Sequence, residues 1–445
     1  MALAASVRRE IAEWLHNRRG DPCFARFGHH FDVLDVALGR MLDAVTGELT
    51  EAGRARSSGE TYERCRELDR SLLTARRMFD WYAGKYDQRL NDRLAPALRA
   101  ADEIVRSCWQ QPFAVLKRDA PTGPLPYFDV RFDAHATPRV SVPPDLRGPA
   151  DSPIADLVRR LPIPAIALPV WASSEAWWLV LAAHETGHHV QKDLASSLEN
   201  ATRSALAEAV RTVLRDEDAA AQWAGWGLEL FADAYSILMV GEAASWAIDE
   251  LEHAPATKLV AMPQPGDRYP PPAIRRALLG ELARQAGAGD RRPGAKETLA
   301  WIQSLDEPAA AVRKVVESHL AAVPAVATAL LDISVDGQSL RRLSGARLEW
   351  FAAKGRMDMW ARRLSAPAPV LPRLDERAAA RLVIGAGVTA TAHTTGDDRL
   401  RLHNNLVEIL PVCGPPGRMG VAPPAPEVDD LADDLARRLL AGGAR

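Results

Sequence analysis

The sequence is poor in cysteine, lacks long apolar runs and carries almost no net charge. Its four cysteines are spread over 445 residues without a CxxC pair, which predicts reduced thiols rather than a disulfide framework. The first 20 residues carry charges at positions 8–10 and lack the uninterrupted apolar core of a signal peptide. The apolar stretch at 320–333 contains a proline and is too short to span a bilayer. These absences predict a soluble, cytoplasmic protein without a membrane partner.

The small net charge also limits the kinds of partner. A formal charge of −3 gives neither the basic field that binds nucleic acid nor an acidic tail, so we expect no nucleic-acid partner. With 47% hydrophobic and 25% charged residues, the composition is that of a globular protein. The length predicts two or three domains.

Local composition divides the chain into three regions. Residues 1–118 place apolar side chains at helical spacing and predict a helical N-terminal domain. A segment rich in proline and glycine follows, and residues 119–290 mix strand and helix patterns. Residues 291–445 return to helical patterns between proline-rich breaks. The predicted fold class is therefore mostly α (α+β), with a small sheet in the middle of the chain.

Three segments of the central region are candidate strands. Residues 127–134 alternate apolar and polar side chains, and residues 138–144 are a second candidate strand that follows them. Residues 161–170 form a short apolar segment that contains several prolines, which predicts an edge strand rather than a central one because proline cannot donate to the ladder.

A helix expected at about 174–198 carries the HExxH pattern in the sequence HETGH. His184 and His188 are one turn apart on one face, where two imidazoles can bind one tetrahedral metal ion, usually zinc. Glu185 lies beside that face, placed to take a proton from a metal-bound water. Gly187 weakens the helix and is expected where another backbone packs closely. The alternative is a chance match on an exposed polar helix.

A catalytic zinc site needs a third protein ligand. The longer HExxHxxGxxH pattern is absent, because HVQKDL follows the motif. A second predicted helix, starting near Asp216 or Asp218 and ending at Gly241, places Glu229 and Asp233 one turn apart among apolar residues. Two carboxylates there are costly to bury unless a metal and a histidine N–H satisfy them. Glu229 is then the third ligand, and Asp233 orients a ligand histidine, His184.

The acidic residues in and before this helix have other interpretations. The two acids on 226–241 can instead face water on an amphipathic helix. Glu199 and Glu208 are nearer to the motif, but neither is followed four residues later by a carboxylate.

The combination of HETGH and ELFAD resembles the gluzincin branch of the zincin metallopeptidases, over roughly residues 160–280. The gap between the two motifs is longer than in thermolysin-like enzymes. The resemblance implies a catalytic core within 119–290 and a sheet whose edge strand pairs with an extended peptide, for which 164–170 is the candidate. It implies these roles: His184, His188 and Glu229 as Zn²⁺ ligands, Glu185 as general base, and Asp233 as the aspartate behind a ligand.

Such enzymes also need a donor for the tetrahedral oxyanion. The segment DRYPPPAIRRALL resembles a histidine-proline segment with a downstream arginine in some related peptidases, with Tyr269 in the place of that histidine. Tyr269 or Arg275 is the candidate donor; the alternative is a proline-anchored turn that leads into a helix.

Together these patterns predict a zinc metallopeptidase that acts on a peptide or protein. Two alternatives stay open. One is a catalytically inert, zinc-stabilised scaffold that recruits a protein partner through the helical N-terminal domain. The other is a peptidase effector with one dedicated protein target.

Overall fold

The structure is mostly helical, with one small sheet near the middle of the chain, which confirms the predicted fold class. It is a computed structural model, and it describes residues 1–54, 57–130, 134–138, 161–264, 266–289, 291–305, 310–345, 356–369 and 377–443.

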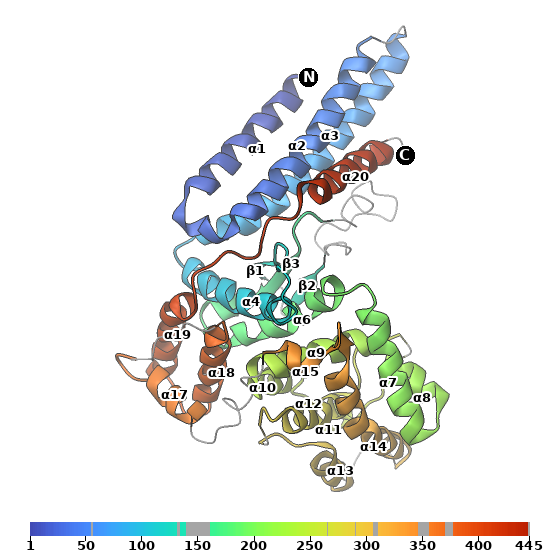
Figure 1. Ribbon diagram of the computed structural model, residues 1–445, viewed down its shortest axis with the longest axis vertical. Coiled ribbons are helices and arrows are strands. Elements are labelled where there is room, and N and C mark those ends of the chain that lie inside the picture. The colour runs from blue at the N-terminus through green and yellow to red at the C-terminus, as the bar shows by residue number, and fades with distance from the viewer. Residues whose placement is uncertain are drawn as a thin grey trace.

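A long helical bundle extends from the body of the protein (Figure 1). It contains α1 (Ala2–Gly20), α2 (Gly28–Ala52) and α3 (Ser58–Asp87), and the last helix, α20 (Ala425–Gly443), packs against α2 and α3. The two ends of the chain therefore meet in one bundle, although the sequence assigns them to different regions. The domain boundaries at 118 and 290 stay a prediction.

The main sheet has three strands in the order β1 (Leu125–Asp129), β3 (Ala165–Pro169), β2 (His135–Thr137). β3 pairs parallel with β1 and antiparallel with β2, so the prediction of an edge strand at 161–170 is wrong. Pro164 stands just before β3 and Pro169 is its last residue, and thus the N–H groups between them remain free to pair. Of the strands predicted at 127–134 and 138–144, the first overlaps β1, and residues 139–144 lie outside the described ranges.

The helix with the HExxH motif, α6, is shorter than predicted and spans Leu181–Asp193. Two short 3-10 helices precede it: η4 (Val170–Ser173), and η5 (Ala176–Val180), which lies where the sequence predicts α-helix from 174. The Ala176 N–H donates to Nδ1 of His403, a residue of α19 (Asp397–Ile409), at 3.2 Å. A contact from a remote part of the chain thus helps fix the path of this segment, which local periodicity does not reveal.

The predicted second helix, from Asp216 or Asp218 to Gly241, is two helices. α8 (Glu217–Gly225) starts with an Asp216 cap, and α9 (Gly227–Val240) ends before Gly241, whose φ is 67°. The break falls at Trp226, a buried ring that packs edge-on against Trp223. The outer limits were predicted well, and the break was not.

The remaining helices surround α9 and the sheet. They are α4 (Ala95–Val115), α7 (Leu198–Leu214), α10 (Ala243–Leu251), α11 (Ala256–Leu259), α12 (Pro272–Ala286), α13 (Ala295–Gln303), α14 (Ala310–Asp332), α15 (Leu340–Leu343), α17 (Arg356–Leu364) and α18 (Ala379–Thr391), with a small hairpin of β4 (Ser334–Val335) and β5 (Gln338–Ser339). By length and composition alone, Val312–Asp332 is apolar enough to cross a membrane; half of its apolar window is buried, and core helices pass the same test.

Candidate metal centre

The site forms where α6 packs directly on α9. Gly187 makes this approach possible, because a Cβ atom built there would lie 2.9 Å from the Ala232 Cα. No side chain other than hydrogen fits such a gap without a shift of one helix. The expectation that another backbone packs against Gly187 is therefore confirmed, and the close contact brings the two motifs together.

His184, His188 and Glu229 converge across this contact. Glu229 Oε2 lies 3.4 Å from His184 Nε2 and 3.3 Å from His188 Nε2. In the described part of the chain these three side chains are the one group of histidine, cysteine and carboxylate ligands close enough to hold a metal ion. Glu199 and Glu208, the alternatives considered for the third ligand, instead form ion pairs with Lys192, Arg203 and Arg211.

The residues present fit a zinc ion. Zinc–nitrogen and zinc–oxygen bonds of about 2.0–2.1 Å in a tetrahedron separate neighbouring ligand atoms by roughly 3.3–3.4 Å, which matches the two spacings to Glu229. Glu229 Oε2 is buried and has no hydrogen-bond partner. A buried carboxylate oxygen without a partner is costly, and a cation between it and the imidazoles removes that cost. Two nitrogens and one oxygen are also the donor set that zinc uses in catalytic sites.

Asp233 lies behind His184, as the sequence predicts. Its Oδ1 is 3.0 Å from His184 Nδ1, although the ring N–H is not aligned well enough to make a good hydrogen bond. Asp233 is fully buried, and Arg275 of α12 donates to both of its oxygens at 2.7 and 2.8 Å. The remaining guanidinium nitrogen of Arg275, Nη1, donates to the Glu252 carboxylate at 2.6 Å. Arg275 thus holds the carboxylate that faces the ligand histidine.

The cluster has strongly coupled protonation. Burial alone would raise the pKa of Glu229, but His184 and His188 outweigh that effect and hold it well below the usual range. Burial would lower the pKa of His184, yet Asp233 and Glu229 outweigh it and raise this pKa to about 10. Arg275 overcomes the effect of burial on Asp233 and lowers its pKa to about 2. Without a metal, the site therefore holds a proton on an imidazole, which a metal ion would replace because ligands must be deprotonated.

Glu185 lines the same cavity as His188 and Glu229 and contacts the backbone of β2. The backbone N–H of Ala136 hydrogen-bonds to its carboxylate, and burial raises the pKa of Glu185. Alternate residues of a strand direct their N–H groups to opposite sides. The bond to Glu185 therefore shows that the edge of β2 not paired with β3 points toward the site.

A cavity of about 290 Å³ opens onto these residues. Glu185, His188, Glu229 and Tyr269 line it, together with part of β2. Tyr269 is 45% exposed, and its ring packs 4.8 Å from the Arg275 guanidinium. Arg275 does not line the cavity, and its donors are used by Asp233 and Glu252. Of the two candidate oxyanion donors, Tyr269 is the one that faces the space where a substrate can bind.

Sequence reasoning missed the partners that support the site from outside the two motifs. The sequence offered no signal that Arg275 pairs with Asp233, since the two residues lie 42 positions apart on different helices. Ala136 and Glu252 also contribute through single contacts that no short motif contains.

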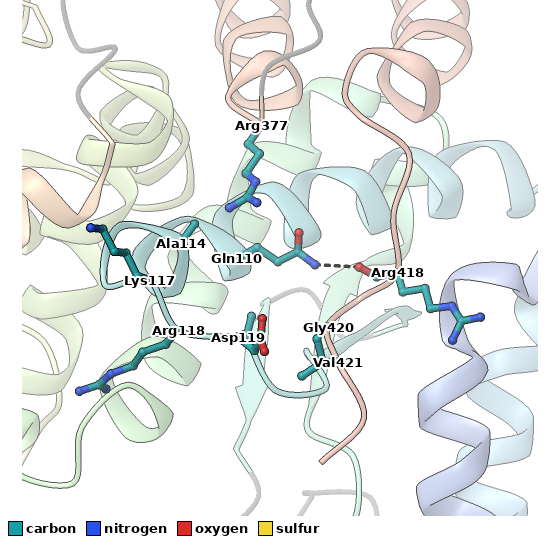
Figure 2. A pocket seen from close by; sticks show the side chains of 10 residues that line it. Gln110, Ala114, Lys117, Arg118, Asp119, Arg377, Arg418, Gly420 and Val421 are labelled. Atoms are coloured by element: carbon teal, nitrogen blue, oxygen red, sulfur yellow. Dashed lines mark hydrogen bonds between the residues drawn. The ribbon is translucent and has the colours of Figure 1, made fainter. Parts of the chain in front are cut away.

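A larger cavity, of about 450 Å³, lies at the end of α4 and is lined by several basic residues. Figure 2 shows Arg377 pointing into it, whereas Arg418 and Arg118 point away from its centre. Arg118 pairs with Asp336, and Arg418 contacts His29 at 3.0 Å. This cavity gathers no ligand set like that of the smaller one, so we assign the candidate site to the cavity beside α6.

Comparison of the chain with protein-family models, with curated proteins and with solved structures gives no significant match.

Proposed function

We propose that the protein is a zinc-dependent peptidase whose water nucleophile is activated by Glu185. One observation carries the proposal. Two imidazoles and an unpartnered buried carboxylate converge at tetrahedral spacing, next to a second buried carboxylate that lines the same cavity. A purely structural zinc site closes all four positions with protein ligands, whereas three ligands beside a cavity leave one position for chemistry.

His184, His188 and Glu229 would hold the ion. When bound, zinc supplies Lewis-acid chemistry: it makes a water more acidic and polarises a carbonyl. Asp233 keeps His184 in the orientation that presents Nε2 to the site, and Arg275 keeps Asp233 ionised.

Glu185 would move the protons. Burial raises the pKa of Glu185 toward neutral pH, and a general base works best when its pKa is near the working pH. The carboxylate takes a proton from water as the water oxygen bonds to the scissile carbonyl carbon. It then returns that proton to the amide nitrogen as the carbon–nitrogen bond breaks. The hydroxyl of Tyr269, a residue that lines the cavity, would donate a hydrogen bond to the oxyanion.

The edge of β2 that faces away from β3 would bind the substrate backbone. The role that the resemblance gives to residues 164–170 cannot belong to β3, because β3 has a neighbour on each side. Among the described strands β2 pairs only with β3, and Ala134, Ala136 and Pro138 line the cavity. The Ala136 N–H already donates to Glu185, so an extended peptide would pair with this edge through other main-chain groups, such as the Ala136 carbonyl.

The test separates chemistry from metal binding. Glu185→Gln should retain stoichiometric zinc and lose at least about 100-fold in kcat on a peptide library, the scale of general-base catalysis. Glu229→Ala should lose both zinc and activity. Should the wild type hold zinc and be as inert as Glu185→Gln on every peptide, the peptidase proposal is wrong and the zinc-stabilised scaffold is favoured.

A further inference from the structure

The cavity beside α6 is lined by two basic side chains that have no role in the proposed chemistry. Its two carboxylates, Glu185 and Glu229, are taken by proton transfer and by metal binding. The other charged residues that line it, Arg268 and Lys192, are both basic. The charged side chains that the proposed chemistry leaves unused are therefore both positive, although the protein as a whole carries a formal charge of −3.

Arg268 is an exposed cation without a partner in the described part of the chain. Its guanidinium makes no ion pair or hydrogen bond with a described residue. The neighbouring carboxylate, Asp267, accepts a hydrogen bond from the Gln264 backbone N–H at 2.7 Å. Arg268 directly precedes Tyr269, the candidate oxyanion donor. Since no described residue pairs with its guanidinium, Arg268 can bind a ligand in the cavity that it lines.

Lys192 lies on the same face of α6 as the ligand histidines. It follows His188 by four residues on α6, so it lies on the same face of the helix one turn later. Lys192 pairs with Glu199, but Glu199 also pairs with Arg203 at 2.9 Å. Two cations therefore share one carboxylate, and a net positive charge remains at this end of the cavity.

We propose that the site is selective for substrates with a carboxylate close to the scissile amide, bound by Arg268 with support from Lys192. The inference rests on the proposed peptidase function. An acidic side chain and a free C-terminal carboxylate present the same group, and a guanidinium binds either through paired, charge-assisted hydrogen bonds. Among the described residues that line the cavity, Glu185 and Glu229 have roles in the proposed chemistry, so a basic substrate group next to Arg268 and Lys192 would be repelled by them.

Binding can be measured without turnover. Zinc-loaded Glu185→Gln is titrated with three fluorescent peptides of one neutral sequence: amidated, amidated with one internal glutamate, and with a free C-terminus. We expect at least one carboxylate peptide to bind about tenfold more tightly than the neutral one, the effect of a charge-assisted hydrogen bond. The peptide that gains identifies the source of the carboxylate. Equal affinities for all three overturn the inference.

Variants assign the preference to the cavity. In the Glu185→Gln background, Arg268→Ala should remove most of the tenfold difference in affinity between the carboxylate and neutral peptides. Arg268→Glu should instead favour a peptide that contains lysine. Arg203→Ala is the matched control. Arg203 also pairs with Glu199, but it does not line the cavity. A preference that survives Arg268→Glu, or that Arg203→Ala removes equally, contradicts the proposal.

Hydrolysis separates the two proposals. If the wild type cleaves the neutral and carboxylate peptides with equal kcat/KM and Arg268→Ala changes nothing, the selectivity is wrong while the peptidase function stands. If nothing is cleaved but the binding preference and its loss in Arg268→Ala are seen, the peptidase function fails and the carboxylate site remains.

Discussion

Asp233 lies 3.0 Å from Nδ1 of His184, on the side of the ring opposite to Glu229. The aspartate is completely buried in α9, yet it stays ionised because Arg275 grips both of its oxygens. This arrangement fixes which imidazole nitrogen faces the candidate metal, so the ligand set depends on residues that never contact the ion.

Removing the Asp233 charge should weaken zinc binding. Asp233→Asn is expected to lower zinc affinity by about 10- to 100-fold, the usual cost of losing the carboxylate behind a ligand histidine. Competition with a chromophoric chelator measures it. Asp249→Asn is the control, because Asp249 pairs with Arg276 and Arg292 away from the ligands. Equal affinities in the two variants would show that Asp233 does not support the site.

Arg275 should be essential for stability. Arg275→Met leaves the carboxylates of Asp233 and Glu252 without their cation inside the protein, a change that costs about 3–5 kcal/mol when a buried pair is broken. Denaturant unfolding of the metal-free protein measures the loss. Arg275→Lys should recover part of it, because an ammonium restores the charge but not the paired hydrogen bonds. An unchanged unfolding midpoint in Arg275→Met would refute this account.

Gly187 should not tolerate a side chain. In Gly187→Ala the new methyl would meet Ala232 at 2.9 Å, and overpacking of about 1–3 kcal/mol should outweigh the gain of about 1 kcal/mol in helix propensity. We expect lower stability and weaker zinc binding, because α6 and α9 must separate. The control is Gly47→Ala in α2, where nothing lies within 4 Å and the substitution should stabilise the protein. If both variants gain stability, the close helix contact is not as described.

Acid should destabilise the fold through His319. This buried histidine accepts a hydrogen bond from Trp223 Nε1 at 2.9 Å, and burial lowers its pKa below the ordinary 6.5. Because the unfolded chain binds the proton more readily, this contribution is complete above pH 6.5 and is lost as the pH falls below it. His319→Gln should flatten the decline of unfolding free energy between pH 7 and 5. The exposed His16→Gln should not, and a wild-type slope in His319→Gln would contradict the assignment.

The sequence allowed the local part of the site to be predicted. Helical periodicity put His184 and His188 on one face, and the cost of burying two acids in an apolar helix pointed to Glu229 and Asp233. The glycine in the motif indicated a close helix contact. Each of these inferences uses spacing within one helix, which the chain specifies locally.

The unpredicted features depend on contacts between remote segments. β3 is central because β1 and β2 pair on its two sides, and no property of 165–169 identifies those neighbours. α8 and α9 separate at Trp226, whose ring packs against Trp223 of α8 and against His319 of α14. Arg275 reaches Asp233 from α12, a helix whose own sequence contains no metal motif. Long-range packing decides all three.

The most direct measurement is an anomalous difference map from crystals grown with zinc, collected on both sides of the zinc absorption edge. We expect one strong peak about 2.0–2.2 Å from Nε2 of His184, Nε2 of His188 and a carboxylate oxygen of Glu229. A map without a peak among these three side chains, or with the Glu229 carboxylate turned away from the ion, would contradict this expectation.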